Sequence, residues 1–215
     1  MSCAICHARK ERRFCPALHE RICAPCCGRE REVTLDCPSE CEYLQEARRH
    51  ERRSLEDVDP ALLFPEIEVR EQLIYEREPL IAGLSFALAR AARKDRTMRD
   101  PDAIAAMSAL ARRVRTLLES GLHVPGENVA PAQQALAKEL EQTVAEYRQA
   151  EQKHIGYATL KDSELVQALV FMVRMAHART SGRPRSRAFL DFVTAQFPES
   201  AAAKMETADS RLVIP

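Results

Sequence analysis

Apolar residues recur at intervals of three and four along most of the chain beyond residue 60, with polar residues between them. This spacing places the apolar side chains on one face of an α-helix. Stripes of this kind begin at Ile67, Leu80, Ile104, Leu136, Leu165 and Phe189. Strand-like alternation is absent from the same part of the sequence. We therefore expect a mainly α protein, with a helical bundle or array of about six helices.

Proline and aspartate indicate where several of these helices begin and end. Pro79, the Asp100-Pro101 pair and Pro184 are typical of a first helical turn, where the N–H that proline lacks would have no partner within the helix. Asp162-Ser163 is typical of a helix cap. Pro198 should end the last helix, because a proline cannot continue the backbone hydrogen bonding.

The N-terminal segment has a different pattern. All eight cysteines of the chain lie between Cys3 and Cys41, and apolar side chains are few there. Such a short segment cannot bury enough apolar surface to fold alone, whereas a structural zinc ion supplies about 10–16 kcal/mol of apparent binding energy. We expect a zinc-binding module at residues 1–45, a charged connecting helix and linker at 46–60, a helical domain at 61–198 and a flexible tail at 199–215.

The cysteines are spaced in close groups, which suits a tetrahedral metal ion. A tight turn can hold both sulfurs of a C-x2-C or C-x3-C pair about 2.3 Å from one ion, and a second pair completes the site. Eight sulfur ligands make two closed sites with no position for water, which is typical of structural zinc. The expected ligands of two Zn2+ ions are Cys3, Cys6, Cys15, Cys23, Cys26, Cys27, Cys37 and Cys41.

This order of ligand pairs resembles the cross-brace zinc fingers of the B-box, MYND and HIT type. The resemblance implies a small treble-clef-like module in which alternate ligand pairs share an ion. Cys3, Cys6, Cys23 and Cys26 would then bind one ion. Cys15, Cys37 and Cys41 would bind the other, with either Cys27 or His19 as the fourth ligand. An unpaired thiol beside a metal site is prone to oxidation, which favours Cys27.

The residues of the motifs around Cys15, Cys23–Gly28 and Cys37–Leu44 also resemble those of uncharacterised bacterial proteins that carry such a module ahead of a helical region. That resemblance covers about a quarter of the chain. It implies an organisation and a bacterial source, and it implies no activity.

Other cysteine chemistries remain open at this point. Cys3-Ala4-Ile5-Cys6-His7 matches the attachment motif of c-type haem, but haem attachment requires export and leaves six cysteines unexplained. A redox C-x-x-C normally stands beside a βαβ unit, for which there is no pattern here. Four cysteines can also hold an iron–sulfur cluster, so spacing alone does not separate zinc from iron.

Charge and hydropathy restrict the partners and the compartment. The chain has 32 basic and 32 acidic residues, and 46% of it is hydrophobic. Eight thiolates with two Zn2+ ions would bring the net charge to about −4, which argues against a generally basic nucleic-acid binder. The longest apolar run is too short to span a bilayer. We expect a cytoplasmic protein, where reduced cysteines bind metal rather than form disulfides.

One basic cluster stands outside the cysteine-rich segment. Arg183, Arg185 and Arg187 surround Pro184, at a position where the sequence predicts a helix start. Because a helix N-terminus attracts anions, these arginines are candidates for binding a phosphate, a nucleic acid or an acidic partner. The simpler interpretation is a solvated loop that leads into a helix.

The sequence carries no pattern of a catalytic site. It has no glycine-rich phosphate loop, no H-E-x-x-H and no G-x-S-x-G, and its remaining histidines stand alone. We therefore expect a zinc-dependent interaction, scaffolding or regulatory protein whose partner is another protein, and no enzyme. The alternatives are a nucleic-acid-binding regulator that uses the basic residues of the module with Arg183–Arg187, and an enzyme without a visible motif. The oligomeric state is left open.

Overall fold

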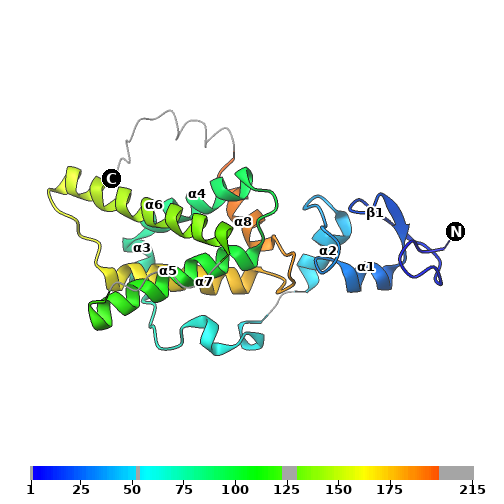
Figure 1. Ribbon diagram of the computed structural model, residues 1–215, viewed down its shortest axis with the longest axis horizontal. Coiled ribbons are helices and arrows are strands. Elements are labelled where there is room, and N and C mark those ends of the chain that lie inside the picture. The colour runs from blue at the N-terminus through cyan, green and yellow to red at the C-terminus, as the bar shows by residue number, and fades with distance from the viewer. Residues whose placement is uncertain (1, 52–53, 123–129, 199–215) are drawn as a thin grey trace.

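The computed structural model describes residues 2–51, 54–122 and 130–198 of the 215-residue chain. The tail expected at 199–215 lies outside these residues. Figure 1 shows two parts: a small N-terminal module at one end of the long axis and a larger helical domain at the other. Within the described residues, no helix is both long enough and apolar enough to cross a bilayer.

The N-terminal module is built around a short hairpin and two helices. Strand β1 (Arg13–Cys15) pairs antiparallel with β2 (Glu20–Ile22), and Cys15 lies opposite Glu20. Helix α1 (Ala24–Glu30) follows β2 directly, and α2 (Glu42–His50) begins after Cys41. The buried interior of the module contains five cysteines and, as aliphatic side chains, Ile22 and Leu35, with Leu44 buried on α2 beside them. It is thus a sulfur-rich interior with very little hydrocarbon, as the sequence predicts.

Two short 3-10 helices and six α-helices make up the helical domain. Their bounds are η1 (Leu55–Asp57), η2 (Pro60–Leu63), α3 (Glu71–Glu76), α4 (Glu78–Lys94), α5 (Asp100–Ser120), α6 (Pro131–Ile155), α7 (Asp162–Arg179) and α8 (Ala188–Gln196). Apart from Ile67, the apolar stripes of the sequence fall on α3 to α8, one stripe to each helix. The prediction of a mainly helical protein is confirmed.

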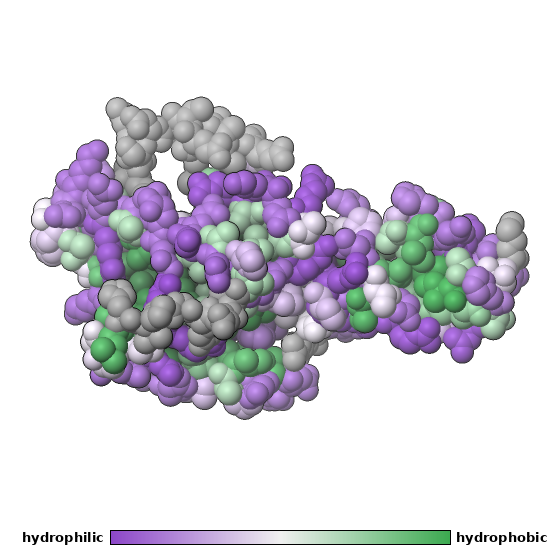
Figure 2. All heavy atoms as spheres, in the orientation of Figure 1, coloured by the Kyte–Doolittle hydropathy of each residue, from purple (hydrophilic) through white to green (hydrophobic). Residues whose placement is uncertain are grey.

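Helix α7 lies at the centre of this domain. It packs along α5 and also contacts α3, α4, α8 and both 3-10 helices. Its apolar side chains are buried on several sides; fully buried ones include Leu169, Met172 and Val173. Helices α4 and α6 pack against each other and complete the enclosure of the core. Figure 2 shows the result, a mainly hydrophilic surface with apolar side chains visible between the helices.

Most helix starts agree with the sequence, and one differs. Pro79 and Pro101 lie in the first turns of α4 and α5, and α7 begins at Asp162. The last helix, however, begins at Ala188 and not at Pro184. The cause is a distant residue: Asp100 accepts hydrogen bonds from the backbone N–H groups of Phe189 (3.2 Å) and Leu190 (3.1 Å) and so caps the helix there.

Candidate metal centre

Four cysteines of the N-terminal module converge at one point. The sulfur atoms of Cys3, Cys6, Cys23 and Cys26 all lie within 4.8 Å of one another. The Sγ atoms of Cys6 and Cys23 are 3.9 Å apart. Four sulfurs at about 2.3 Å from a zinc ion in tetrahedral geometry lie about 3.8 Å from each other. The arrangement therefore fits a zinc ion bound by four cysteines.

Backbone hydrogen bonds hold these ligands in place. The N–H of His7 donates to the carbonyl of Cys3 at 2.8 Å, and His7 has a positive φ of 53°, so the chain turns tightly after the first ligand pair. The N–H of Ala4 donates to the carbonyl of Arg21 on β2, which ties the turn to the hairpin. Cys23 is the N-cap residue of α1, and Pro25 in the first turn of α1 favours a helix start there.

The surroundings favour the thiolate at Cys3 and Cys6 and disfavour it at Cys26. Burial raises the pKa of the Cys3 thiol, but hydrogen bonds from the backbone of Cys6, Cys23 and Ile5 outweigh it and bring the pKa to about 6. Backbone hydrogen bonds from Ala8 and Arg9 lower the pKa of Cys6. The sulfur of Cys23 beside Cys26 raises the pKa of the Cys26 thiol to about 12. Four such crowded sulfurs cannot all be ionised unless a cation lies between them.

The other four cysteines line a small hollow elsewhere in the same module. Cys15, Cys27, Cys37 and Cys41 face it together with apolar side chains such as Ile22 and Leu44. Burial raises the pKa of Cys37 to about 11, with a contribution from the charges of Cys15 and Cys41, while a hydrogen bond from the backbone of Glu32 opposes the increase. Among the described residues, only Cys3, Cys6, Cys23 and Cys26 meet the tight spacing of a metal cluster.

The structure separates the two candidates for the last ligand of this second set. Cys27 is buried in α1, with 7% of its surface exposed, and lines the hollow. His19 lies in the turn between β1 and β2, is exposed, and is not among the residues that line the hollow. These positions favour Cys27.

The arginine cluster contacts the rest of the protein in three different ways. The guanidinium of Arg183 donates to the carbonyls of Gly28 (2.8 Å) and Arg31 (2.6 Å) in the N-terminal module. Arg187 donates to three carbonyls around the end of α4, those of Ala92, Arg96 and Met98. Arg185 has an exposed side chain, and its backbone N–H donates to the carbonyl of Glu32 at 2.9 Å. Two of the three side chains thus bind carbonyl groups of the chain itself.

The burial of three carboxylates could not be predicted from the sequence. Glu32, Asp100 and Glu151 are each at most 2% exposed. Glu32 lies between the module and the helical domain, where it accepts hydrogen bonds from Arg48 and Ser181. In sequence these residues resemble ordinary surface acids, because the groups that bind them come from distant segments. Arg48, for example, reaches Glu32 and Asp191 from α2 and forms ion pairs with both.

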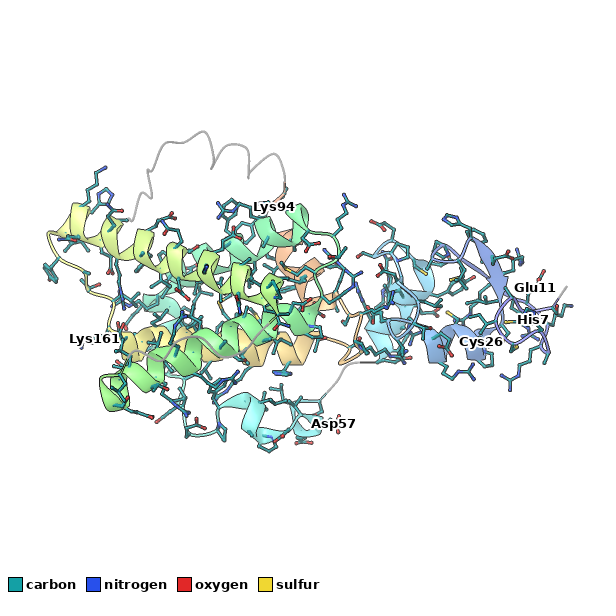
Figure 3. All side chains as sticks on the ribbon, in the orientation of Figure 1. His7, Glu11, Cys26, Asp57, Lys94 and Lys161 are labelled. Carbon is teal, nitrogen blue, oxygen red and sulfur yellow. The ribbon has the colours of Figure 1, made fainter. Side chains whose placement is uncertain are left out.

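The two cysteine sets occupy different places in the module. Figure 3 shows Cys26 and His7 at the end of the molecule remote from the helical domain, whereas α2, which follows Cys41, lies on the side that faces it. Comparison with models of protein families, with curated proteins and with solved structures finds no match for the chain. Its function is therefore inferred from the geometry of its own residues.

Proposed function

We propose that this chain is a zinc-dependent interaction protein whose partner is another protein and whose metal has a structural role. The observation that carries the proposal is the convergence of Cys3, Cys6, Cys23 and Cys26 on one point. Four protein ligands close a tetrahedral site and leave no position at which a water or a substrate could be activated. A closed site of this kind stabilises a surface and supplies no chemistry.

A second zinc ion at Cys15, Cys27, Cys37 and Cys41 completes the proposal. Its support is the shared hollow, the burial of Cys15 and Cys27, and the chemistry of four sulfur donors without a competing histidine. Binding of the ion would draw the four sulfurs together to the spacing that zinc needs. The expected stoichiometry is two zinc ions per chain.

The partner surface that we propose lies on the module. Phe14 on β1 is 50% exposed, and Leu18 in the hairpin turn is 40% exposed, as is Val33 beyond α1 at 39%. In Figure 2, apolar side chains form a visible patch on the module. These exposed side chains add little buried apolar surface to the interior of the module. Contact with a partner therefore explains their exposure better.

The experiment combines metal analysis with partner capture. Protein purified without added metal should contain two zinc ions per chain, and capture from native lysate should recover a partner protein. Phe14→Ser with Leu18→Ser should keep both zinc ions and lose the partner. Tyr75→Ser is the matched control, since Tyr75 is 72% exposed but lies on the helical domain; it should keep the partner.

Two results would contradict the proposal. One is a metal-free chain whose module is ordered, because the interior would then need no ion. The other is equal recovery of the partner by the wild type and by a Cys23→Ser, Cys26→Ser double variant that has lost its zinc. Binding to DNA or RNA that weakens steeply with salt would favour a nucleic-acid function. The internal hydrogen bonds of Arg183 and Arg187 make that alternative less attractive.

A further inference from the structure

The N-terminal module and the helical domain share a polar contact surface, here called the domain interface. Arg48 on α2 donates to Asp191 on α8 at 2.8 Å, and Ser39 donates to the same carboxylate at 2.6 Å. Asp36 forms an ion pair with Arg99 at 2.6 Å. The residues of the interface are Gly28, Arg31, Glu32, Asp36, Ser39 and Arg48 from the module, and Arg99, Ser181, Arg183, Arg185 and Asp191 from the helical domain.

The segments that supply the second cysteine set also supply this interface. Cys37 stands between Asp36 and Ser39, both of which bind the helical domain. Cys27 precedes Gly28, whose carbonyl accepts a hydrogen bond from Arg183. Cys41 is the N-cap residue of α2, the helix that carries Arg48. Three of the four cysteines therefore stand close to an interface contact in sequence. Cys27 and Cys37 are next to contact residues, and Cys41 begins the helix that carries Arg48.

Glu32 lies beside both features. It follows Arg31, whose N–H donates to the carbonyl of Cys27 at 3.0 Å and whose carbonyl accepts a hydrogen bond from Arg183 at 2.6 Å. Its carboxylate, 2% exposed, accepts hydrogen bonds from Arg48 at 2.9 Å and from Ser181 at 2.8 Å, and its carbonyl accepts one from the N–H of Arg185 at 2.9 Å. The backbone of Glu32 has a positive φ of 53°, a conformation that a non-glycine residue keeps only when its surroundings hold it.

The first cysteine set is connected to the interface less closely, through α1, in which Cys26 lies two residues before Gly28. Cys3, Cys6, Cys23 and Cys26 are held by the hairpin and by their own turn, and Figure 3 places Cys26 away from the helical domain. The two sites therefore differ in what the loss of an ion would disturb.

We infer that occupation of the second site by zinc controls the docking of the module onto the helical domain, because Cys37 stands between Asp36 and Ser39, both of which bind the helical domain. This inference rests on the proposed second zinc ion. Loss of that ion frees Cys37 and Cys41, loosens the neighbouring segments that bind the helical domain and opens the interface. The module then separates from the helical domain while the helical domain keeps its own core. The protein thus has a docked, metal-loaded state and an undocked state with one ion.

Hydrogen exchange at the N–H of Arg185 measures docking directly, since that group donates to Glu32 across the interface. In the full chain, Cys37→Ser with Cys41→Ser should lower the zinc content from two ions to one. The exchange of the Arg185 amide should accelerate by about tenfold or more, because a closed interface protects it and an open one does not. Amides in the middle of α7 should keep the wild-type rate.

A second pair of variants leaves every cysteine in place. Glu32→Gln weakens the contacts to Arg48 and Ser181, and Glu46→Gln is the matched control, because Glu46 is exposed on α2. Coupling between two equilibria is reciprocal. Glu32→Gln should therefore accelerate the release of one of the two zinc ions to a chelator by about fivefold or more, and Glu46→Gln should not.

The outcomes separate the inference from the proposed function. If the double cysteine variant loses one ion and the Arg185 amide stays protected, the second site exists and the coupling is wrong. Unchanged zinc release in Glu32→Gln also overturns the coupling. If the double cysteine variant still holds two ions, the proposed second site itself is wrong, and the inference fails with it.

Discussion

The hydroxyl group of Ser186 donates a hydrogen bond to Oδ2 of Asp100 at 2.7 Å, and both side chains are fully buried. The same carboxylate caps α8 through Phe189 and Leu190. In return, the N–H of Asp100 donates to the carbonyl of Ser186 at 2.8 Å. The start of α5 and the start of α8 are therefore held by one pair of residues far apart in the sequence.

Asp100→Ala should destabilise the helical domain by about 3 kcal/mol or more, because the substitution leaves buried donors of the Ser186 turn and of α8 without an acceptor. The free energy of unfolding in urea measures the effect. Glu68→Ala is the control, since Glu68 is exposed, and it should change stability by less than about 0.5 kcal/mol. Equal values for the two variants would show that the cap contributes nothing.

Arg77→Met should be at least as harmful. Arg77 forms ion pairs with Glu151 at 3.0 Å and with Glu164 at 2.7 Å, and the carboxylate of Glu151 is almost fully buried. Removal of the arginine leaves an uncompensated buried charge, which costs about 3–5 kcal/mol. Thermal unfolding followed by circular dichroism gives the measurement. Arg77→Met with Glu151→Gln should recover part of the loss, and no recovery would argue against the pairing.

Acid should weaken the same region through Glu151. Burial raises the pKa of its carboxyl, but hydrogen bonds from Thr159 and Leu160 and the charge of Arg77 outweigh it, and the net pKa lies below its ordinary value of 4.5. A carboxyl with a lowered pKa in the folded state stabilises the fold above its unfolded pKa, and this contribution is lost as the pH falls through the folded pKa. The stability difference between wild type and Glu151→Gln should shrink on acidification below about pH 4.5; a constant difference would contradict the assignment.

Removal of metal should unfold the N-terminal module and leave the helical domain folded. A strong chelator should make residues 2–51 sensitive to protease, because the interior of the module holds few aliphatic side chains, Ile22, Leu35 and Leu44, beside its cysteines. The helical domain has its own apolar core and should retain most of the helical circular dichroism signal. A complete loss of that signal on chelation would show that the domain depends on the metal.

Local patterns were enough to predict the helices. The stripes of α4 to α7 arise from a period of 3.6 residues, which any isolated segment of the chain already contains. Pro79 and Pro101 predicted two helix starts for an equally local reason, since a proline fixes its own φ angle. The predicted start of the last helix at Pro184 was wrong, because the carboxylate of Asp100, a residue distant in sequence, caps α8 at Phe189 and Leu190.

The sequence by itself predicted a metal site in the module, because eight cysteines occur in a segment with almost no apolar side chains, and it determined the helical class of the remainder. Only the tertiary structure decided which cysteines meet, that Arg183 and Arg187 bind carbonyl groups, and that Glu32, Asp100 and Glu151 are buried. Periodicity and composition are properties of neighbouring residues. Burial and hydrogen-bond partners depend on segments that meet only when the chain has folded.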